Sequence, residues 1–298
     1  MEGVLITGGN GLLGKKIAHM LSIKGYDIKI LTRNPKNTPS SNEYFWDYSK
    51  QRIDTEALSG IHHVIHLAGA NVGEKRWSAN QKLEIVNSRV DSASFLLSHL
   101  IQHNIQLKSF ISASAIGYYG NGTMLKDETS NLGAGFLAEV CEQWEKMADN
   151  YSGISKNVAK LRLGVVFDKN EGAFPKIIQP LKFSLLVALG GGNQLYSWIH
   201  IDDASGFFVY ALENNLSGTY NVCANPPLPL KTILSNVTKI IGKKTISVPA
   251  PAFFLRLALG EQSAIVLDSI AANNQKMLSS GYPFKYPTLE MALSELIE

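Results

Sequence analysis

The chain has 298 residues, of which 45% are hydrophobic and 18% are charged, and its formal net charge is +3. This near-neutral balance gives no argument for a nucleic-acid or membrane partner, and no apolar run is long enough to cross a bilayer. Two cysteines cannot form a disulfide framework, and a glycine-rich motif stands where a signal peptide would lie, so we expect a cytoplasmic protein.

The first motif joins a short apolar strand to a helix through a run of glycines. Residues 4–7 read Val-Leu-Ile-Thr, and residues 8–14 follow as Gly-Gly-Asn-Gly-Leu-Leu-Gly. The first glycine permits a sharp turn, the third lets the main chain approach a pyrophosphate, and the last lets helix and strand pack closely. The positive end of the helix favours the anion. The motif therefore predicts a dinucleotide site that includes Gly8, Gly11, Leu12, Leu13 and Gly14.

The end of the next predicted strand, residues 27–32, indicates which dinucleotide is bound. A protein that binds NAD usually has Asp or Glu there, because a carboxylate accepts a hydrogen bond from the ribose 2′-hydroxyl. This chain has Thr32 and Arg33 instead. A guanidinium can pair bidentately with a 2′-phosphate, so NADP is favoured over NAD. The alternative is that Arg33 is only a solvated basic residue.

Two further segments are expected to flank the cofactor. A strand over residues 64–69 ends in Leu67, Ala68 and Gly69, where small residues allow the cofactor to pass over the strand end. A helix is predicted over residues 78–103, and its apolar stripe leaves out Glu84 and Arg89. These two side chains are solvated by default, but the early part of such a helix flanks the cofactor in dinucleotide folds.

The alternation of strands and helices predicts the fold. Further strands are expected over residues 44–46, 110–115 and 158–166, with a helix from Phe136 between the last two. This order is typical of an α/β protein with a Rossmann-type, doubly wound parallel sheet, here with a smaller α/β substrate-side domain. The expected boundaries are 1–170 for the NADP-binding domain, completed by parts of 196–225, and 171–298 for the substrate-side region, with a mostly helical segment at 249–298.

Taken together, these residues resemble the extended and atypical short-chain dehydrogenases, the NAD(P)-dependent epimerase/dehydratase superfamily. Within it, the chain is similar to the sugar-epimerase-like group that has its own small C-terminal domain. The resemblance covers nearly the whole chain, at residues 8–14, 67–69, 76–77, 88–90, 112–115, 117–120, 136–139, 144–145, 161–162, 197–203, 249–250 and 286–290. It implies cofactor contacts at Thr32, Arg33, Leu67, Ala68, Glu84, Arg89 and Val165.

The chain departs from the superfamily at the catalytic pair. The superfamily uses Tyr and Lys four residues apart, where the ammonium favours the phenolate that moves the proton. No tyrosine here precedes a lysine by four residues, and the alignment puts Leu137 at the Tyr position and Cys141 at the Lys position. The narrower group is similar in this respect and keeps an upstream serine, here Ser114. The candidates for proton transfer are therefore Ser114, Tyr119 and Cys141, although Tyr119 can be ordinary structure and Cys141 a buried, inert thiol.

Trp198 and His200 are the candidate substrate contacts, and Asp202 and Asp203 follow them. The alternative is that these side chains hold the two halves of the molecule together. We expect an NADP-dependent oxidoreductase or epimerase-like enzyme that acts on a small polar substrate such as a nucleotide sugar. The alternative is a non-catalytic NADP(H)-binding regulator, a class that relatives described as cell-division inhibitors keep open. We expect no metal site, and a homodimer is one candidate assembly.

Overall fold

The computed structural model describes residues 1–36, 42–242 and 244–298. Within these residues, eight strands form the central sheet in the order β13-β8-β6-β5-β1-β2-β3-β4, and only β4 runs antiparallel to its neighbour. The expected doubly wound sheet is confirmed, because the chain moves outward from β1 in both directions. The strands are β1 (Gly3–Thr7), β2 (Asp27–Thr32), β3 (Glu43–Asp47), β4 (Arg52–Ile53), β5 (Ile61–His66), β6 (Leu107–Ala115), β8 (Ser155–Leu163) and β13 (Gly218–Val222).

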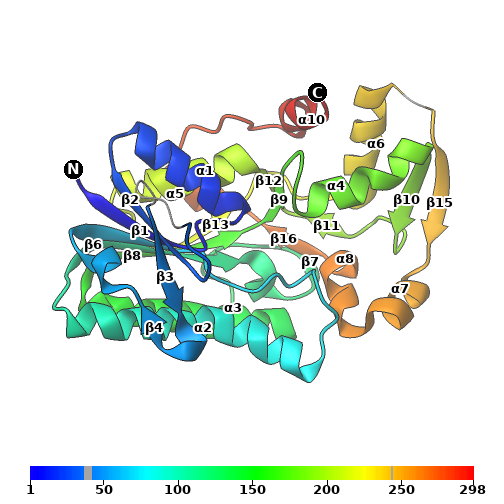
Figure 1. Cartoon of the computed structure of the whole chain (residues 1–298). Coiled ribbons are helices and arrows are strands. Elements are labelled where there is room, and N and C mark those ends of the chain that lie inside the picture. Colours follow the sequence, from blue (N-terminus) through cyan, green and yellow to red (C-terminus); the bar gives the residue numbers. More distant parts are fainter. Residues whose placement is uncertain (37–41, 243) are drawn as a thin grey trace.

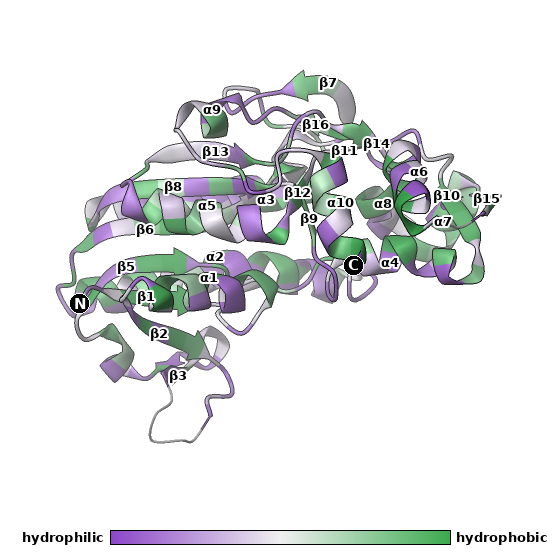
Figure 2. Cartoon of the chain, turned by 90° about the horizontal axis from the view of Figure 1, so that it is seen from above, coloured by the Kyte–Doolittle hydropathy of each residue, from purple (hydrophilic) through white to green (hydrophobic). Residues whose placement is uncertain are grey.

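Helices cover both faces of this sheet (Figure 1). One pair, α1 (Leu12–Ile23) and α5 (Ile201–Glu213), packs on one face, and α2 (Ala79–Gln102) and α3 (Phe136–Asp149) pack on the other. Buried side chains such as Ile17 and Phe207 join Ile6 of the sheet in one core, whereas Leu96 and Phe110 belong to the core on the opposite face. Figure 2 shows hydrophobic residues in β1, β2 and β5, as expected for strands whose sheet is covered by helices on both faces.

Two helices begin directly after a residue whose side chain caps the helix N-terminus. The Ser78 hydroxyl accepts a hydrogen bond from the Gln81 backbone N–H at 3.2 Å, and α2 begins at the next residue, close to the predicted start. His200 accepts from the Asp202 backbone N–H at 3.1 Å, and α5 begins at the next residue, Ile201. In α5 an imidazole therefore does what the serine hydroxyl does in α2.

The second half of the chain forms small sheets and helices beside the carboxyl edge of the central sheet (Figure 1). One sheet has the order β14-β11-β16-β7, and β7 comes from the first half of the chain. Its strands are β7 (Gly122–Lys126), β11 (Leu195–Tyr196), β14 (Leu228–Pro229) and β16 (Ile270–Ala272), and the other pairs are β9 (Val165–Phe167) with β12 (Trp198–His200) and β10 (Leu185–Leu189) with β15 (Ile246–Ala250). The halves are therefore interleaved.

The remaining helices pack around a third core, in which α10 lies against α6. They are α4 (Ala173–Ile178), α6 (Leu230–Ile241), α7 (Ala252–Leu259), α8 (Ala264–Leu267), α9 (Gln275–Ser279) and α10 (Leu289–Ile297). Single 3-10 turns occur as η1 (Tyr48–Lys50), η2 (Thr55–Leu58), η3 (Ile116–Tyr119), η4 (Asn150–Gly153), η5 (Gln179–Phe183) and η6 (Gly260–Ser263). Among the described residues, no helix has both the length and the apolar character needed to span a bilayer.

Candidate functional site

The glycine turn between β1 and α1 has the geometry that a dinucleotide requires. Gly8 has a φ of +68°, and a Cβ there would lie 2.9 Å from the carbonyl carbon of Leu67. A Cβ on Gly14 would collide with the Gly8 carbonyl and lie 2.6 Å from the Gly9 Cα, so helix and turn touch through backbone atoms. No side chain caps the start of α1, where Gly11 is the N-cap. The free backbone N–H groups at this end suit a pyrophosphate.

A first cavity, about 230 Å³ in volume, opens beside this turn. Thr7 of β1 is aligned with Leu31 of β2 and His66 of β5, so the three strands end together beneath it. This is the position, outside the carboxyl ends at the reversal of strand order, where doubly wound sheets bind ligands. The cavity brings together seven of the residues predicted to contact the cofactor: Gly8, Gly11, Thr32, Arg33, Ala68, Gly69 and Glu84.

The wall of the first cavity carries one basic, one acidic and two aromatic side chains, namely Arg33, Glu84, Trp46 and Tyr48. Arg33 is exposed at the wall, and Tyr48 donates a hydrogen bond to Glu84 at 3.4 Å. Burial and then the Glu84 carboxylate raise the pKa of Tyr48 to about 12, so its hydroxyl stays protonated. Tyr48 and Trp46 line this cavity, yet the sequence reasoning considered Trp46 only as part of a strand. Glu84 stands on α2 and not at the end of β2, where an NAD-type carboxylate would stand.

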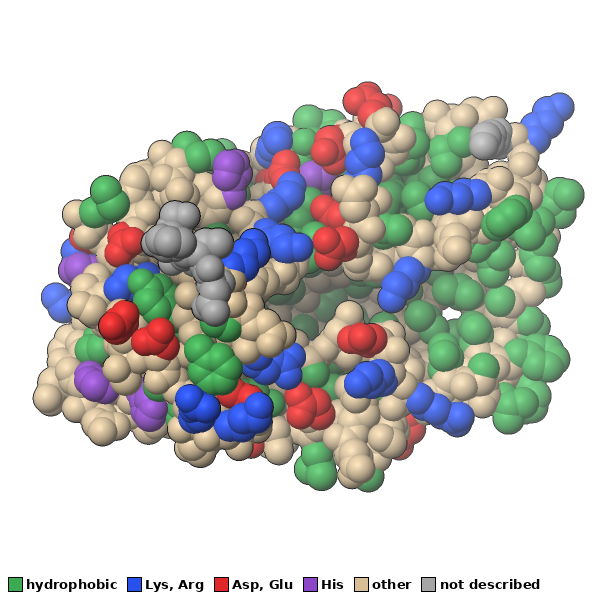
Figure 3. All heavy atoms as spheres, in the orientation of Figure 1, with side chains coloured by type: hydrophobic (Ala, Val, Ile, Leu, Met, Phe, Trp, Pro, Cys, Tyr) green, Lys and Arg blue, Asp and Glu red, His purple; other side chains and the backbone are tan. Residues whose placement is uncertain are grey.

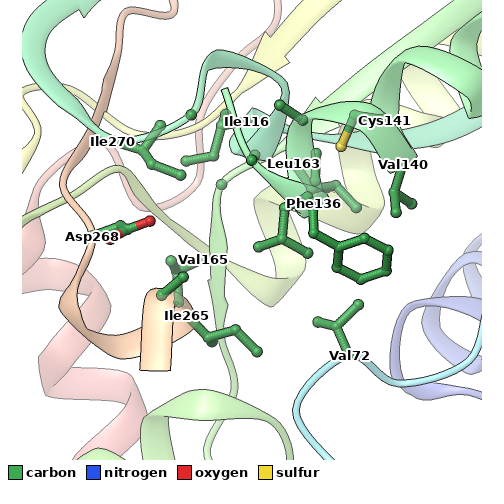
Figure 4. Close-up of a pocket in the computed structure, with 18 of the residues that line it drawn as sticks. Val72, Ile116, Phe136, Val140, Cys141, Leu163, Val165, Ile265, Asp268 and Ile270 are labelled. Carbon is green, nitrogen blue, oxygen red and sulfur yellow. The ribbon is translucent and has the colours of Figure 1, made fainter. Parts of the chain in front are cut away.

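A second cavity, about 270 Å³ in volume, lies between the central sheet and the C-terminal region (Figure 4). Three residues predicted to be functional line it, namely Arg89 of α2, Cys141 of α3 and Val165 of β9. In Figure 3 a hollow is visible in the middle of the face, with charged side chains around its rim. The fold thus places part of the predicted cofactor residues, and one of the three proton-transfer candidates, in the walls of these two cavities.

Arg89 lies between the loop after β5 and the second cavity. Its Nη1 donates to the carbonyls of Ile85 and Ala70 at 2.8 and 3.1 Å, and its guanidinium lies 4.9 Å from the Trp144 ring centroid. A Cβ on Gly69 would lie 2.9 Å from the guanidinium carbon. Burial lowers the pKa of Arg89, and no carboxylate of the described chain pairs with it. A partly buried cation without an anion suits a cofactor that carries phosphates.

Leu137 and Cys141 face the second cavity from successive turns of α3. A Cβ on Gly117 would lie 3.4 Å from the Leu137 Cβ and 3.7 Å from the Cys141 sulfur, so both side chains point towards the same loop. Burial and then the Glu145 carboxylate raise the pKa of Cys141 to about 11. The thiol therefore stays protonated at neutral pH, and it supplies no positive charge of the kind that lysine supplies.

Ser114 and Tyr119 lie outside the described lining of both cavities, in a buried polar network. Ser114 donates to Glu145 Oε1 at 2.7 Å, and Arg162 donates to both oxygens of Glu145 at 2.7 and 2.8 Å. Tyr119 accepts from Arg162 Nη1 at 2.9 Å and donates to Asn221 at 2.7 Å. Burial raises the pKa of Tyr119 to about 12 despite the Arg162 charge. This network joins β6, η3, α3, β8 and β13, and sequence reasoning did not find it.

Trp198 and His200 lie in the core beside the second cavity without lining it. The Trp198 ring stacks on Phe167 with centroids 5.8 Å apart. His200 Nε2 donates to Glu295 Oε2 of α10 at 2.9 Å, while Asp203 accepts from the backbone N–H groups of Lys285 and Tyr286 at 2.7 and 2.9 Å. These contacts connect α5 to the C-terminal segment, which is the alternative that the sequence left open.

Four other residues predicted to bind the cofactor lie next to the glycine turn between β1 and α1. Leu12, Leu13, Gly14 and Leu67 adjoin the turn without lining either cavity as described. Residues that sequence reasoning missed come mainly from the loop after β5 and from the C-terminal region: Val72, Trp77, Ala264, Ile265, Asp268 and Ile270. The described ranges contain no cluster of three or more His, Cys, Asp or Glu side chains placed to hold a metal ion.

Two family models match the chain. One describes the NAD dependent epimerase/dehydratase family and matches residues 4–223, and the other describes a domain of unknown function, DUF1731, and matches residues 250–296. The epimerase family protein YfhF of Bacillus subtilis is 31% identical over 298 residues, which cover 99% of this chain and 97% of that protein. An epimerase family protein of Staphylococcus aureus is 30% identical and is covered completely, as is this chain.

Solved structures share the fold. The human epimerase family protein SDR39U1, solved with NADPH, superposes with a TM-score of 0.86 at 24% identity, covering 99% of this chain and 98% of that one. A nucleoside-diphosphate sugar epimerase from Corynebacterium glutamicum gives a TM-score of 0.77 at 26% identity, covering 99% of this chain and 58% of that one. The agreement extends over both halves of the chain described above.

Proposed function

The chain belongs to the NAD dependent epimerase/dehydratase family, and from this premise we propose that it binds NADP(H) and acts as an oxidoreductase or epimerase-like enzyme on a small molecule held in the second cavity. The observation that carries the proposal is the first cavity beside the uncapped start of α1, together with a second cavity lined by Arg89, Cys141 and Val165. Gly8, Gly11 and the first turn of α1 would hold the pyrophosphate, and Thr32 with Arg33 would hold the adenosine end.

The second cavity would hold the reacting end of the cofactor beside Val165, Cys141 and Arg89. Bound there, the nicotinamide would supply a hydride or accept one. Leu137 has no proton to exchange, and Cys141 lacks the fixed charge that lowers the pKa of a phenol. Ser114 and Tyr119 are engaged with Glu145, Arg162 and Asn221. The proton is therefore exchanged with another group that lines the second cavity.

The NADP preference is tested by titrating the protein with NADPH and with NADH and following nicotinamide fluorescence. We expect NADPH to bind more tightly, and Arg33→Asp to reduce the preference by roughly 10-fold or more, because a charge-assisted contact is replaced by repulsion. Arg52→Asp is the matched control, since Arg52 lies over the Phe45 ring and outside the described lining of the first cavity. Equal affinities of the native protein for both cofactors would contradict the preference.

A nucleotide sugar remains the substrate suggested by the sequence, and a specific observation weakens it. A diphosphate needs cations, and among the described residues that line the second cavity, Arg89 is the only Lys or Arg. A turnover assay that follows NADPH absorbance should therefore include apolar alcohols and ketones beside the sugar nucleotides.

The second candidate function is a regulator that binds NADP(H) without turning over a substrate. The presence of Leu137 and Cys141 in place of Tyr and Lys favours it. Tight NADPH binding with no turnover against either class of compound would support this candidate. Turnover of any compound that depends on residues lining the second cavity would exclude it.

A further inference from the structure

The wall of the second cavity is almost entirely apolar. Figure 4 shows side chains from four separate regions converging on it: Val72 from the loop after β5, Phe136 and Val140 from α3, Val165 from β9 and Ile265 from α8. Most of these side chains expose carbon to the space. A surface of this kind favours an apolar ligand, because binding removes apolar area from water.

One carboxyl group interrupts this apolar wall. Asp268 lines the cavity, and it is the only labelled side chain in Figure 4 that carries an oxygen. No hydrogen bond or ion pair from residues 1–36, 42–242 or 244–298 reaches its carboxylate. Burial raises the pKa of Asp268, and the Arg256 charge opposes that effect. The described residues offer this carboxyl no donor and its oxygens are not fully buried, so it is open to a hydrogen bond from a ligand in the cavity.

The backbone on both sides holds Asp268 in place. Its N–H donates to the Ala264 carbonyl at 3.0 Å, at the end of α8. The next residue, Ser269, donates its N–H to Asn121 Oδ1 at 2.9 Å and accepts at its carbonyl from Gly122 N–H at 2.7 Å. The backbone that carries the carboxyl is therefore fixed between α8 and β16, which suits a residue that orients a ligand.

We propose that the second cavity binds an apolar alcohol, or the ketone derived from it, and that Asp268 is the catalytic residue that holds and exchanges the proton at the ligand oxygen. The proposal rests on the proposed function and names its substrate class. Oxidation of such an alcohol releases a hydride from carbon, which bound NADP⁺ accepts, and a proton from oxygen, which the Asp268 carboxylate accepts and later releases to solvent. In the reverse direction the protonated carboxyl donates to the ketone oxygen.

Binding is measured first, by calorimetry without cofactor, so that this test does not depend on NADP(H). The probes are 1-(naphthalen-2-yl)ethanol, its hydrocarbon counterpart 2-ethylnaphthalene, and UDP-glucose. We expect the alcohol to bind about 10-fold more tightly than the hydrocarbon, because its hydroxyl donates to the Asp268 carboxylate. UDP-glucose should bind this cavity more weakly than either, since Arg89 is the only Lys or Arg among the described lining residues and cannot balance a diphosphate alone.

Two substitutions separate the roles of Asp268. In Asp268→Leu the preference for the alcohol over the hydrocarbon should disappear. In Asp268→Asn the amide still bonds to the hydroxyl, so the preference should remain within about 3-fold, whereas alcohol oxidation should fall by about 10²-fold or more because the amide accepts no proton. Glu290→Gln, an exposed carboxylate on α10, is the matched control and should leave both measurements unchanged.

Equal binding of the alcohol and hydrocarbon, tighter binding of UDP-glucose, failure of both naphthalene compounds to bind, or a preference that survives Asp268→Leu would each overturn the proposal. So would full oxidation activity in Asp268→Asn. If the binding results hold but the native protein oxidises no alcohol, the proposed enzymatic function fails and with it the proton-transfer role, while the ligand class stands. The two failures are therefore distinguishable.

Discussion

At the scale of single residues, Gly11 and Gly14 show how one motif serves two purposes. A Cβ on Gly11 would meet only the Gly8 carbonyl oxygen, at 3.3 Å, whereas a Cβ on Gly14 would collide with backbone atoms of the turn. The space in front of Gly11 is therefore available to a ligand, and the space at Gly14 is occupied by the protein. Loss of the first glycine should affect binding, and loss of the second should affect stability.

We predict that Gly11→Ala keeps nearly the native free energy of unfolding but weakens NADPH binding by roughly 10-fold or more, because the side chain enters the pyrophosphate position. Gly14→Ala should lower the free energy of unfolding by about 1–3 kcal/mol through overpacking. Urea denaturation and fluorescence titration measure the two effects. A Gly14→Ala protein as stable as the native one, or a Gly11→Ala protein with native affinity, would contradict this division.

At the scale of secondary-structure elements, His66 connects β1, β5 and α2. Its Nδ1 lies 2.9 Å from the Thr7 hydroxyl and its Nε2 lies 3.4 Å from the Ser92 hydroxyl, and the ring is fully buried. Burial lowers the pKa of His66 to about 4. His66 is thus a packed strand residue. Protonation of its ring would lower the stability of the junction between β1, β5 and α2.

The sign of the pH effect follows from proton binding. Between about pH 6.5 and pH 4 the unfolded chain binds a proton at this histidine and the folded chain does not, so stability falls as the pH falls. We predict a loss of about 3 kcal/mol across this window from His66 alone. Urea unfolding at several pH values measures it. His66→Asn should flatten this part of the profile, and His103→Asn, at an exposed position, should leave it unchanged.

At the scale of the whole molecule, Asp203 on α5 anchors the C-terminal segment to the half that carries the glycine turn. Its two oxygens accept from Lys285 N–H and Tyr286 N–H, and the Tyr282 hydroxyl lies 3.4 Å away. Asp202, the next residue, instead pairs with the exposed Lys285 ammonium at 2.8 Å and with Lys16. We therefore expect these two neighbouring carboxylates to contribute very differently to the free energy of unfolding.

We predict that Asp203→Asn lowers the free energy of unfolding by about 1–3 kcal/mol, because the amide turns an N–H towards a buried backbone donor. Limited proteolysis within residues 250–298 should become faster. Asp202→Asn is the matched control and should cost less than about 1 kcal/mol, since its ion pairs are partly solvated. Similar losses in both variants would show that Asp203 is not a special anchor.

Several features could be predicted from the sequence because they depend on neighbouring residues. The glycine turn follows from positions 8–14, the doubly wound sheet from the alternation of apolar strands and amphipathic helices, and the missing catalytic pair from Leu137 and Cys141. Backbone freedom, hydrophobic periodicity and one-turn spacing are local properties, so they can be read without knowing what packs against them.

Only the tertiary structure decided which polar groups line a cavity and which are buried in a network. Ser114 and Tyr119 have the chemistry for proton transfer, but the alignment of β6 with β8 and the packing of α3 place Arg162 and Glu145 against them. Asp268 lies far along the chain from the glycine turn, and the pairing of β16 with β7 and β11 brings it to the second cavity. The availability of a side chain depends on its partners, and pairing between distant strands selects those partners.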